Sequence, residues 1–294
     1  MMNRNEGHSS YVRCVAFSLD CTKIVSASHD GPAMIWDTQT GKRVNLPLKN
    51  DAGSISCVSF SPEGKEVIAV VGSGVVRHWD VSSGVQTTQR LVGPGRGIAS
   101  LFASDEGRKI ITVQDRHEIR VWDVSTGESL SPPFYGHENL ITDAATSEEC
   151  GRLITTSYDK TARLWDTRTG IGWVLPLTEH RETTYNCAEF SPDGKRIVLG
   201  ADDKMARICD ARSGEEITAP FRGHESSITV ATFSPDGLEI ATGSYDNTVR
   251  IWDVRSGRTL SRLDFDSDPC VLVWREAKIA IGFSDGRVSV FDTT

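Results

Sequence analysis

Short stretches of alternating apolar and polar residues, each closed by a turn signal, recur along the whole chain. In residues 223–265, ITVATFSPDG alternates in this way and ends at a Pro-Asp-Gly turn. EIATGS, TVRIWD and SGRTLSRLDF follow, and Tyr245, Asp246 and Asn247 separate the first two of these segments. Strand side chains point alternately to opposite faces of a sheet, so this pattern predicts four antiparallel strands.

The same unit is repeated seven times. The repeats end in MIWD, RHWD, RVWD, RLWD, RICD, RIWD and SVFD, near Asp37, Asp80, Asp123, Asp166, Asp210, Asp253 and Asp292. These aspartates are separated by 43, 43, 43, 44, 43 and 39 residues. The segments resemble WD40 (β-transducin-like) repeats, each of which forms one blade of a β-propeller. The resemblance implies an all-β, seven-bladed propeller with four antiparallel strands per blade, in a single domain over residues 1–294.

In the WD40 family, a well-formed blade carries a buried tetrad of His, Ser or Thr, Asp and Trp. Three repeats match it: His8, Ser26, Asp30 and Trp36; His137, Thr155, Asp159 and Trp165; and His224, Thr242, Asp246 and Trp252. Each of these buried polar groups needs a hydrogen-bond partner, and together the four satisfy one another. We expect each tetrad to hold the turn between the second and third strands.

The other four repeats depart from the tetrad. Repeat two has Ser73 at the Asp position, repeat three has Asp115 displaced by one residue, and repeat seven keeps Asp285 with Phe291 in place of Trp. Repeat five keeps His180 and Asp203 but has Leu199 and Cys209 where the hydroxyl and the indole belong. We expect these four repeats to depend on apolar packing and to open first.

Closure of the ring is the open structural question. Six polar residues, Met1 to Glu6, precede the first Gly-His, and the chain stops at Thr294, just after the third strand of repeat seven. Either residues 1–6 complete the last blade or that blade keeps three strands. We expect a closed ring with a weak seam, in a chain cut from a longer protein or encoded by a shortened gene.

Composition narrows the class of protein. The chain has 294 residues, of which 38% are apolar and 24% charged, and it contains no apolar run long enough for a membrane helix and no signal peptide. Its seven cysteines are scattered without a CxxC pair, which favours reduced thiols and argues against a zinc site. A net charge of −8 argues against a general nucleic-acid binder. We expect a cytoplasmic monomer, with the nucleus as the alternative compartment, and no cofactor or metal.

The tetrads bring Ser or Thr together with His and Asp, as in a hydrolase triad. The hydroxyls lie on interior strands, occur three times and lack a GxSxG turn, so a structural role explains them better than catalysis. The glycine-rich GPGRG segment at residues 93–97 has no GxxxxGK[ST] continuation and is interpreted as a loop between blades. We therefore expect no enzyme activity.

Binding is expected on the narrow face, which carries the loops that lead into the first strands and the turns between the second and third strands. The family resemblance implies contact positions three and five residues after the Gly-His histidine and directly before the tetrad Asp. They are Tyr11, Arg13 and His29; Leu140, Thr142 and Tyr158; Thr184, Asn186 and Asp202; and Ser227, Thr229 and Tyr245. In the repeats without Gly-His the same count indicates Ser54, Ser56, Arg96 and Ile98.

Two readings of the tyrosines stay open: they are interface anchors, or Tyr158 and Tyr245 only fill the turn and shield the tetrad. Residues 264–268 are acidic and would favour a basic partner.

On the opposite face, Arg168, Arg212 and Arg255 follow WDT, CDA and WDV. This WDxR pattern resembles the motif by which WD40 substrate receptors dock on the adaptor of cullin-RING ubiquitin ligases, although each Arg could instead cap its turn by pairing with a carboxylate.

The leading hypothesis is a non-enzymatic scaffold or recognition module that binds protein or peptide partners on the narrow face; the alternative is a substrate receptor of a cullin-RING ubiquitin ligase. IVSASHDG, FSPDGKRI and IWDVRSGR most resemble the WD40 arrays of fungal NACHT-type proteins. In those proteins the propeller would sense a ligand for an attached nucleotide-switch domain, which the present chain lacks.

Overall fold

The computed structural model describes residues 7–44, 48, 55–61, 63–71, 75–91, 98–104, 109–114, 118–123, 126–147, 151–177 and 182–293. Several positions from the sequence analysis lie outside these ranges: Met1 to Glu6, Ser54, Ser73, the GPGRG segment with Arg96, Asp115, His180 and Thr294. Ser56 and Ile98 lie in described strands, but their side chains are outside the description.

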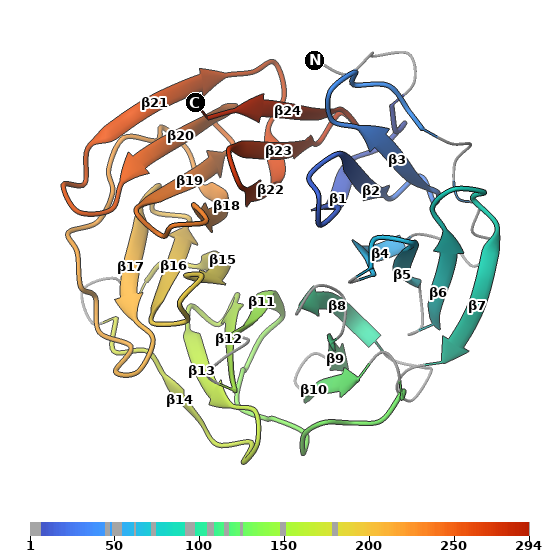
Figure 1. The fold of residues 1–294 in the computed structure, drawn as a ribbon. Coiled ribbons are helices and arrows are strands. Elements are labelled where there is room, and N and C mark those ends of the chain that lie inside the picture. Colours follow the sequence, from blue (N-terminus) through green and yellow to red (C-terminus); the bar gives the residue numbers. More distant parts are fainter. Residues whose placement is uncertain are drawn as a thin grey trace. The chain divides into compact units, whose positions relative to one another are not determined.

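The chain divides into two compact units. The first consists of Met1–Asp115, Val121–Leu130 and Val273–Thr294, and the second of Arg116–Arg120 and Ser131–Leu272. Repeats one, two, three and seven belong mainly to the first unit, and repeats four, five and six form the second. In both units the described secondary structure is entirely β (Figure 1).

The sheets of the first unit follow the repeats. Repeat one contains β1 (Val12–Phe17), β2 (Lys23–Ser28) and β3 (Ala33–Asp37), and repeat two contains β4 (Ile55–Phe60), β5 (Glu66–Val71), β6 (Val75–Asp80) and β7 (Gln86–Leu91). Repeat three contains β8 (Ile98–Ser104), β9 (Lys109–Gln114) and β10 (Glu118–Asp123), and repeat seven contains β22 (Pro269–Arg275), β23 (Lys278–Phe283) and β24 (Val288–Asp292). Within each sheet the strands are neighbours in chain order.

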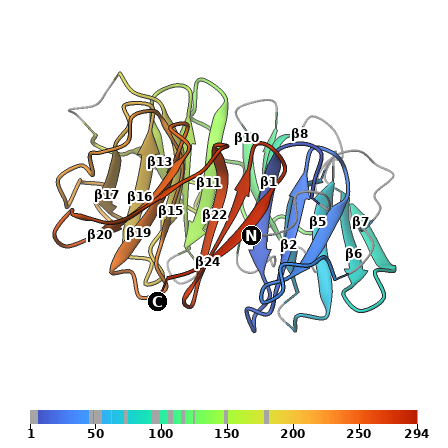
Figure 2. The same cartoon turned by 90° about the horizontal axis from the view of Figure 1, so that it is seen from above.

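The second unit is built in the same way. Repeat four contains β11 (Ile141–Ser147), β12 (Arg152–Ser157), β13 (Ala162–Asp166) and β14 (Gly172–Val174). Repeat five contains β15 (Tyr185–Phe190), β16 (Arg196–Ala201) and β17 (Ala206–Asp210), and repeat six contains β18 (Ile228–Phe233), β19 (Glu239–Ser244), β20 (Thr248–Asp253) and β21 (Thr259–Asp264). Figure 2 shows the structure turned by 90°, and in this view β13, β16 and β19 of the second unit all run roughly upright.

Prolines explain why the fourth strand is regular in some repeats and not in others. The outer segments of repeats two and six contain no proline and form the six-residue strands β7 and β21. Repeats three and five carry Pro132, Pro133 and Pro220 there, and only isolated bridges such as Ile119 with Phe134 or Cys209 with Glu216 hold the segment to its sheet. Proline has no amide hydrogen and therefore interrupts the ladder of an edge strand.

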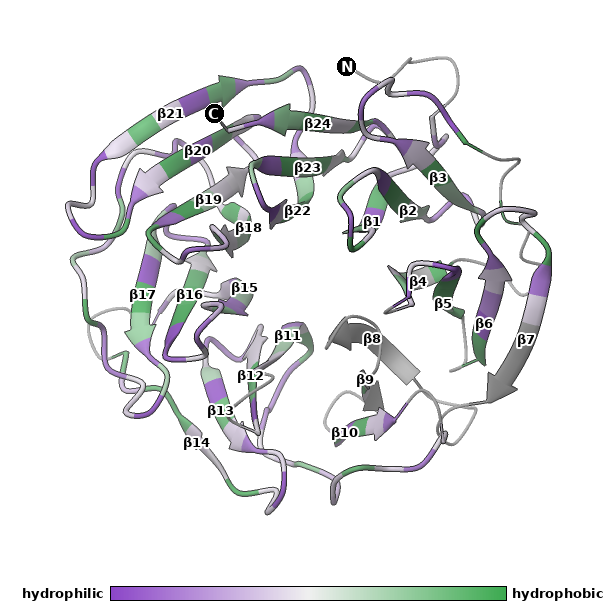
Figure 3. Ribbon diagram, in the orientation of Figure 1, coloured by the Kyte–Doolittle hydropathy of each residue, from purple (hydrophilic) through white to green (hydrophobic). Residues whose placement is uncertain are grey.

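The second strand of each sheet is packed on both faces. In β12, β16 and β19 the five residues after the first are all buried. The edge strand β21 alternates between exposed and partly exposed residues, and Figure 3 shows the same contrast between the hydrophobic β23 and the mixed β21. A strand between two neighbouring sheets has no solvent face, so small and apolar residues follow one another along it.

The hydrophobic cores lie between consecutive repeats. One core cluster joins repeats four and five through residues such as Leu164, Leu175 and Leu199, and another joins repeats five and six through residues such as Ile208 and Trp252. A third joins repeats one and two. A single repeat therefore cannot bury its apolar faces, and each depends on its neighbours for stability.

The first and last repeats lie side by side within the first unit. The backbone N–H of His8 donates to the carbonyl oxygen of Gly286 at 3.2 Å. Gly286 has a φ of +86°, and a Cβ there would lie 2.1 Å from the carbonyl oxygen of His8. Glycine is required at this seam because any side chain would collide with the backbone of repeat one. In the described part of repeat seven the sheet has three strands.

Candidate functional site

The three matching tetrads form continuous hydrogen-bonded chains. In repeat six, Trp252 Nε1 donates to Thr242 Oγ1 at 2.8 Å, Thr242 Oγ1 lies 2.8 Å from His224 Nε2, and His224 Nδ1 lies 2.8 Å from Asp246 Oδ2. Repeat four has the same bonds at 2.8, 2.7 and 2.8 Å, and repeat one at 2.8, 2.8 and 3.0 Å. The hydroxyl accepts from the indole and donates to Nε2, so the second imidazole nitrogen donates to the carboxylate.

Burial and hydrogen bonding shift the pKa values of several tetrad side chains. Burial lowers the pKa of His224 and of His8, although the neighbouring aspartates oppose that shift. Burial alone would raise the pKa of Asp246, but bonds from Thr248, the amide of Glu225 and His224 outweigh it and lower the pKa to about 2. The turns of repeats four and six are thus held by carboxylates whose pKa is lowered by their hydrogen bonds.

The tetrad hydroxyls are unsuited to catalysis. Ser26, Thr155 and Thr242 are fully buried, and each already bonds both an imidazole and an indole. A nucleophile must reach a substrate, and these oxygens cannot.

Repeat five replaces its tetrad with a buried ion pair that the sequence analysis missed. Arg207, which is fully buried, donates through Nη1 to Asp203 Oδ1 at 3.2 Å and through Nη2 to Oδ2. Its Nε lies 3.4 Å from Glu216 Oε1, and its guanidinium is 6.0 Å from the ring centroid of Tyr185. Asp203 therefore holds its turn by a bidentate arginine contact. The sequence offered one indication of this ion pair: in the RICD segment, Arg207 stands near Cys209, which has no indole to complete a tetrad.

Repeat three also retains half of a tetrad that was missed. Trp122 Nε1 donates to Thr112 Oγ1 at 2.8 Å, and Thr112 is 1% exposed. The signal was in the sequence, because the hydroxyl residue stands ten positions before the tryptophan here as in repeats one, four and six.

The structure brings the expected narrow-face residues together in pairs. Within one repeat, the residue before the tetrad Asp donates its backbone N–H to the carbonyl of the residue that leads into the first strand. The bonds are His29 to Tyr11 at 3.4 Å, Tyr158 to Leu140 at 2.9 Å, Asp202 to Thr184 at 2.9 Å and Tyr245 to Ser227 at 3.1 Å. Each pair is positioned by the turn that the tetrad, or Asp203, fixes.

A β-bulge occupies the same place in the first strand of successive repeats. Its extra residue is Arg13 in β1, Thr142 in β11, Asn186 in β15 and Thr229 in β18. A bulge re-aims the side chain it carries. In the second unit it directs these side chains to the next repeat: Thr142 Oγ1 donates to Tyr185 O at 2.7 Å, Asn186 Nδ2 to Ile228 O at 3.0 Å, and Thr229 Oγ1 to Pro269 O at 2.7 Å. The hydrogen bonds of these three side chains therefore link each repeat to the next one.

Two exposed tyrosines dominate the narrow face of the second unit. Tyr158 is 53% and Tyr245 60% exposed, and Asp202 is exposed in the repeat between them. Burial of its inner part raises the pKa of Tyr245, and the charges of Asp268 and Asp202 raise it further. Tyr245 therefore stands in a negative environment.

A cavity of 310 Å³ lies between repeats four and five, and Asp159, the residue after Tyr158, is part of its lining. Residues 159–161 line one side with polar groups, residues 174–177 line the other with Val, Leu and Pro, and Tyr185 completes it. A cavity of this size and mixed lining can take one amphipathic side chain of a partner.

The first unit carries a smaller aromatic group on its narrow face. The rings of Tyr11 and His29 are 4.6 Å apart, and Arg13 Nη1 lies 3.5 Å from His29 Nε2. This cluster combines an aromatic surface with a positive charge, whereas Tyr245 in the second unit lies near the negative charges of Asp202 and Asp268.

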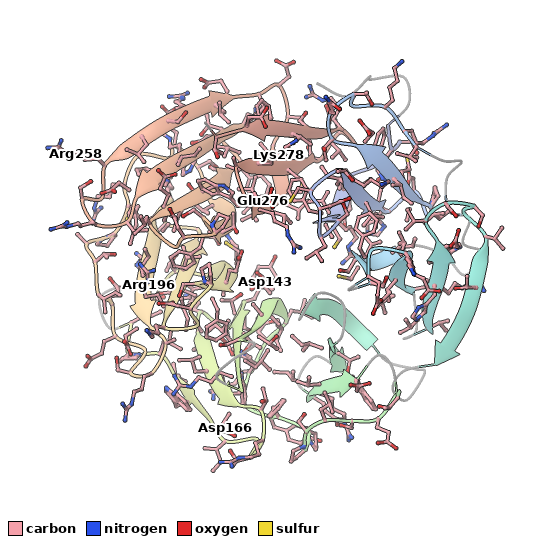
Figure 4. All side chains as sticks on the ribbon, viewed as in Figure 1. Asp143, Asp166, Arg196, Arg258, Glu276 and Lys278 are labelled. Carbon is pink, nitrogen blue, oxygen red and sulfur yellow. The ribbon has the colours of Figure 1, made fainter. Side chains whose placement is uncertain are left out.

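Two carboxyl groups lie on the innermost strands of the second unit and were not expected from the sequence. Burial raises the pKa of Asp143 on β11 to about 6 and that of Glu189 on β15 to about 8. Figure 4 labels Asp143 at the inner edge of this unit, whereas Asp166 lies at its periphery. Glu189 Oε1 accepts from Thr232 Oγ1 at 3.1 Å, and the charge of Asp143 further raises the pKa of Glu189.

The WDxR arginines lie on exposed turns of the second unit. Arg168, Arg212 and Arg255 are exposed, and none of their guanidinium groups forms an ion pair with a described residue. The turns are capped differently: Asp166 Oδ1 accepts from the amides of Arg168 and Thr169, and Asp210 Oδ1 from those of Arg212 and Ser213, at 2.8 to 3.0 Å. Among the described residues the arginine side chains therefore do not cap their turns by pairing with a carboxylate, and their guanidinium groups stay exposed.

The family follows from the repeated sheets together with the comparisons. The family model "WD domain, G-beta repeat" matches residues 2–37, 45–80, 128–166, 174–210 and 215–253. The chain therefore belongs to the WD40-repeat family and has its β-propeller fold; propellers of this family are in general non-catalytic modules that bind protein partners. The repeats without a match, three and seven, are two of those that depart from the tetrad.

Among solved structures, the chain is similar to the computationally designed Ika8 protein. The two are 22% identical with a TM-score of 0.75, and the match covers 98% of each chain. This similarity supports the fold alone. A search of curated proteins finds no matching relative. In the described ranges no helix has the length and apolarity to cross a membrane.

Proposed function

We propose that this protein is a non-enzymatic recognition module that binds a protein or peptide on the narrow face of its second unit. The binding surface consists of Leu140, Tyr158, Thr184, Asp202, Ser227 and Tyr245, with Thr142, Asn186 and Thr229 supporting it from the bulges. The cluster of Tyr11, Arg13 and His29 offers a second contact area on the first unit.

The observation that carries this proposal is the exposure of Tyr158 and Tyr245 on immobilised turns. Each tyrosine directly precedes a tetrad aspartate whose carboxylate is bonded to histidine, so its backbone is held in place. A rigid aromatic side chain contributes a large contact area at a low cost in conformational entropy. Shielding the tetrad would not require side chains that are more than half exposed.

The charge of the surface favours a basic partner segment. Asp202 is exposed in the repeat between the tyrosines, and the charge of Asp268 acts on Tyr245, whereas Glu182 is already paired with Lys160 at 2.6 Å. Lysine or arginine on the partner can place its charge against these carboxylates and its aliphatic stem in the cavity beside Tyr185.

The experiment is an affinity purification from a eukaryotic lysate with wild type and with a Tyr158→Ala, Tyr245→Ala variant, each shown by circular dichroism to be folded. The matched control is Ile171→Ala with Leu238→Ala, because these side chains are 68% and 64% exposed on turns of the opposite face in the same unit. Loss of a specific partner from the tyrosine variant alone is expected. Retention of every partner by the tyrosine variant contradicts the proposal.

A second function has one observation in its favour, the exposed guanidinium groups of Arg168, Arg212 and Arg255. A substrate receptor of a cullin-RING ubiquitin ligase would use them to bind the adaptor, since arginine is well suited to interfaces. An Arg212→Ala, Arg255→Ala variant should then lose the adaptor while the tyrosine variant retains it. Failure of wild type to co-purify an adaptor contradicts this role.

The remaining parts of the proposal concern the cellular compartment, the oligomeric state and other ligands. We place the protein in the cytoplasm, or alternatively in the nucleus, as a monomer without a cofactor and without affinity for membranes or for nucleic acid in general. The likeness to WD40 arrays of fungal NACHT-type proteins favours a role in ligand sensing. Fractionation of native cells and sizing of the purified chain test these points directly.

A further inference from the structure

Two cysteines of the first unit lie next to each other across neighbouring repeats. Cys14 is on β1 and Cys57 on β4, 43 residues apart and therefore at the same register in repeats one and two. Their Sγ atoms are 3.5 Å apart, and both cysteines are reduced.

The backbone of repeat two holds the Cys14 sulfur in this position. Cys14 Sγ lies 3.3 Å from Val58 O, and Val58 N–H donates to the same sulfur at 3.4 Å. Val58 directly follows Cys57, so the group that anchors the first sulfur is covalently attached to the second cysteine. The sulfurs are therefore held near each other by the packing of β1 against β4, and their separation of 3.5 Å exceeds the S–S bond length of about 2.05 Å by roughly 1.5 Å.

The two thiols differ in a way that assigns them different roles. Cys14 is partly exposed, whereas Cys57 is 8% exposed. A hydrogen bond from the Cys57 thiol lowers the pKa of Cys14; burial opposes this shift, and Val58 and the charge of Arg13 support it. Thiol reactivity follows thiolate content and access, so Cys14 is the attacking group and Cys57 the resolving group.

We propose that Cys14 and Cys57 form a dithiol modification site that reacts with small oxidised disulfides such as oxidised glutathione. The Cys14 thiolate attacks one sulfur of the small disulfide, its S–S bond breaks, and one thiolate leaves. Cys57 then loses its proton and attacks Cys14 Sγ in the mixed disulfide, which releases the second thiolate. The protein loses two electrons and two protons, the small disulfide is reduced to two thiols, and the inner strands of repeats one and two become covalently linked.

Cys187 provides an internal comparison. It stands at the same register in β15 of repeat five, where burial raises the pKa of its thiol well above the usual value. Its neighbour at this register in repeat six is Val230, which carries no sulfur. Equal strand positions therefore produce a reactive pair in one unit and an inert thiol in the other.

The test is a redox titration of the folded, reduced wild-type protein with oxidised glutathione. Acid quenching, alkylation of the remaining thiols and digestion with trypsin and chymotrypsin precede mass spectrometry; cleavage after Arg13 and Phe17 separates Cys14 from Cys21. A Cys14–Cys57 linked peptide is expected under conditions that leave Cys187 and Cys209 alkylated. A stable mixed disulfide on Cys14 without the link, or oxidation of Cys187 before Cys14, overturns the proposal.

Single variants separate the two roles. With Cys57→Ser, glutathione is expected to remain attached to Cys14; with Cys14→Ser, Cys57 is expected to react about tenfold more slowly because it is buried. Cys187→Ser is the matched control and should leave the yield of the link unchanged. Equal reaction rates of Cys57 with and without Cys14 contradict the assignment, and the wild-type peptide map decides the proposal even where a variant does not fold.

Discussion

Thr242 and Trp252 are ten residues apart on adjacent strands of repeat six, and the indole Nε1 donates to the threonine Oγ1 at 2.8 Å. The same hydroxyl lies 2.8 Å from His224 Nε2. One oxygen thus satisfies two buried nitrogen atoms from two other segments of the chain, so its removal leaves both without a partner.

Replacing Thr242 with valine preserves the side-chain shape and removes this oxygen. We expect Thr242→Val to lower the free energy of unfolding by about 2 to 4 kcal/mol, because two buried polar groups lose their hydrogen bonds. Urea denaturation followed by tryptophan fluorescence measures the change. Thr242→Ser, which retains the hydroxyl, should lose less than half as much; an equal loss would show that the methyl group rather than the network is responsible.

The ion pair of repeat five depends on the planar guanidinium of Arg207, which binds both oxygens of Asp203. Arg207→Lys keeps the charge but provides only a single point of contact, so we expect a loss of about 1 to 3 kcal/mol in the free energy of unfolding. The matched control is Arg250→Lys, at the same register in β20, where the guanidinium stacks 5.9 Å from the Trp252 ring centroid. A loss at Arg250 as large as that at Arg207 would contradict this account.

Glu189 makes stability depend on pH. The pKa of Glu189 is raised to about 8, whereas a glutamate in the unfolded chain titrates near 4.5, so between these values the folded state holds an extra proton. Stability from this group is therefore lost as the pH rises from about 4.5 to about 8. Glu189→Gln should flatten the profile and raise the free energy of unfolding at pH 9 by about 1 to 2 kcal/mol, less than the full shift because the side chain is partly exposed.

Denaturation at a series of pH values checks this expectation, with Glu215→Gln as the control at an exposed carboxylate. The control should leave the pH profile in its wild-type form. A Glu189→Gln profile parallel to that of wild type would show that the Glu189 carboxyl ionises in the native state without cost.

The order in which repeats open is a further prediction. Repeats one, four and six contain complete tetrads, so amides in β2, β12 and β19 are expected to exchange at least about tenfold more slowly than those in the second strands of repeats two, three, five and seven. Hydrogen exchange with mass spectrometry measures this. If the tetrad repeats exchange first, apolar packing rather than the polar network controls local stability.

Much of the fold and of the narrow face was predictable from the spacing of the repeats together with their resemblance to WD40 repeats. The WD segments at 43-residue intervals located the repeats, and a residue counted from Gly-His or from the tetrad Asp fell beside its partner, as Tyr158 does beside Leu140. The roles of Tyr185 and Arg207 were not predictable. Arginine is rarely fully buried, but the packing of repeat five against its neighbours buries both side chains here.

The sequence by itself determined the strand order, the turn chemistry and the three tetrads, since each depends on residues within one repeat and on the alternation of strand side chains. Only the tertiary structure decided which residues of different repeats meet. Cys14 and Cys57 come within 3.5 Å, Thr142 bonds to Tyr185, and the negative charge of Asp202 and Asp268 reaches Tyr245. Contacts between sheets depend on the distance and twist that packing sets, and no local pattern encodes those quantities.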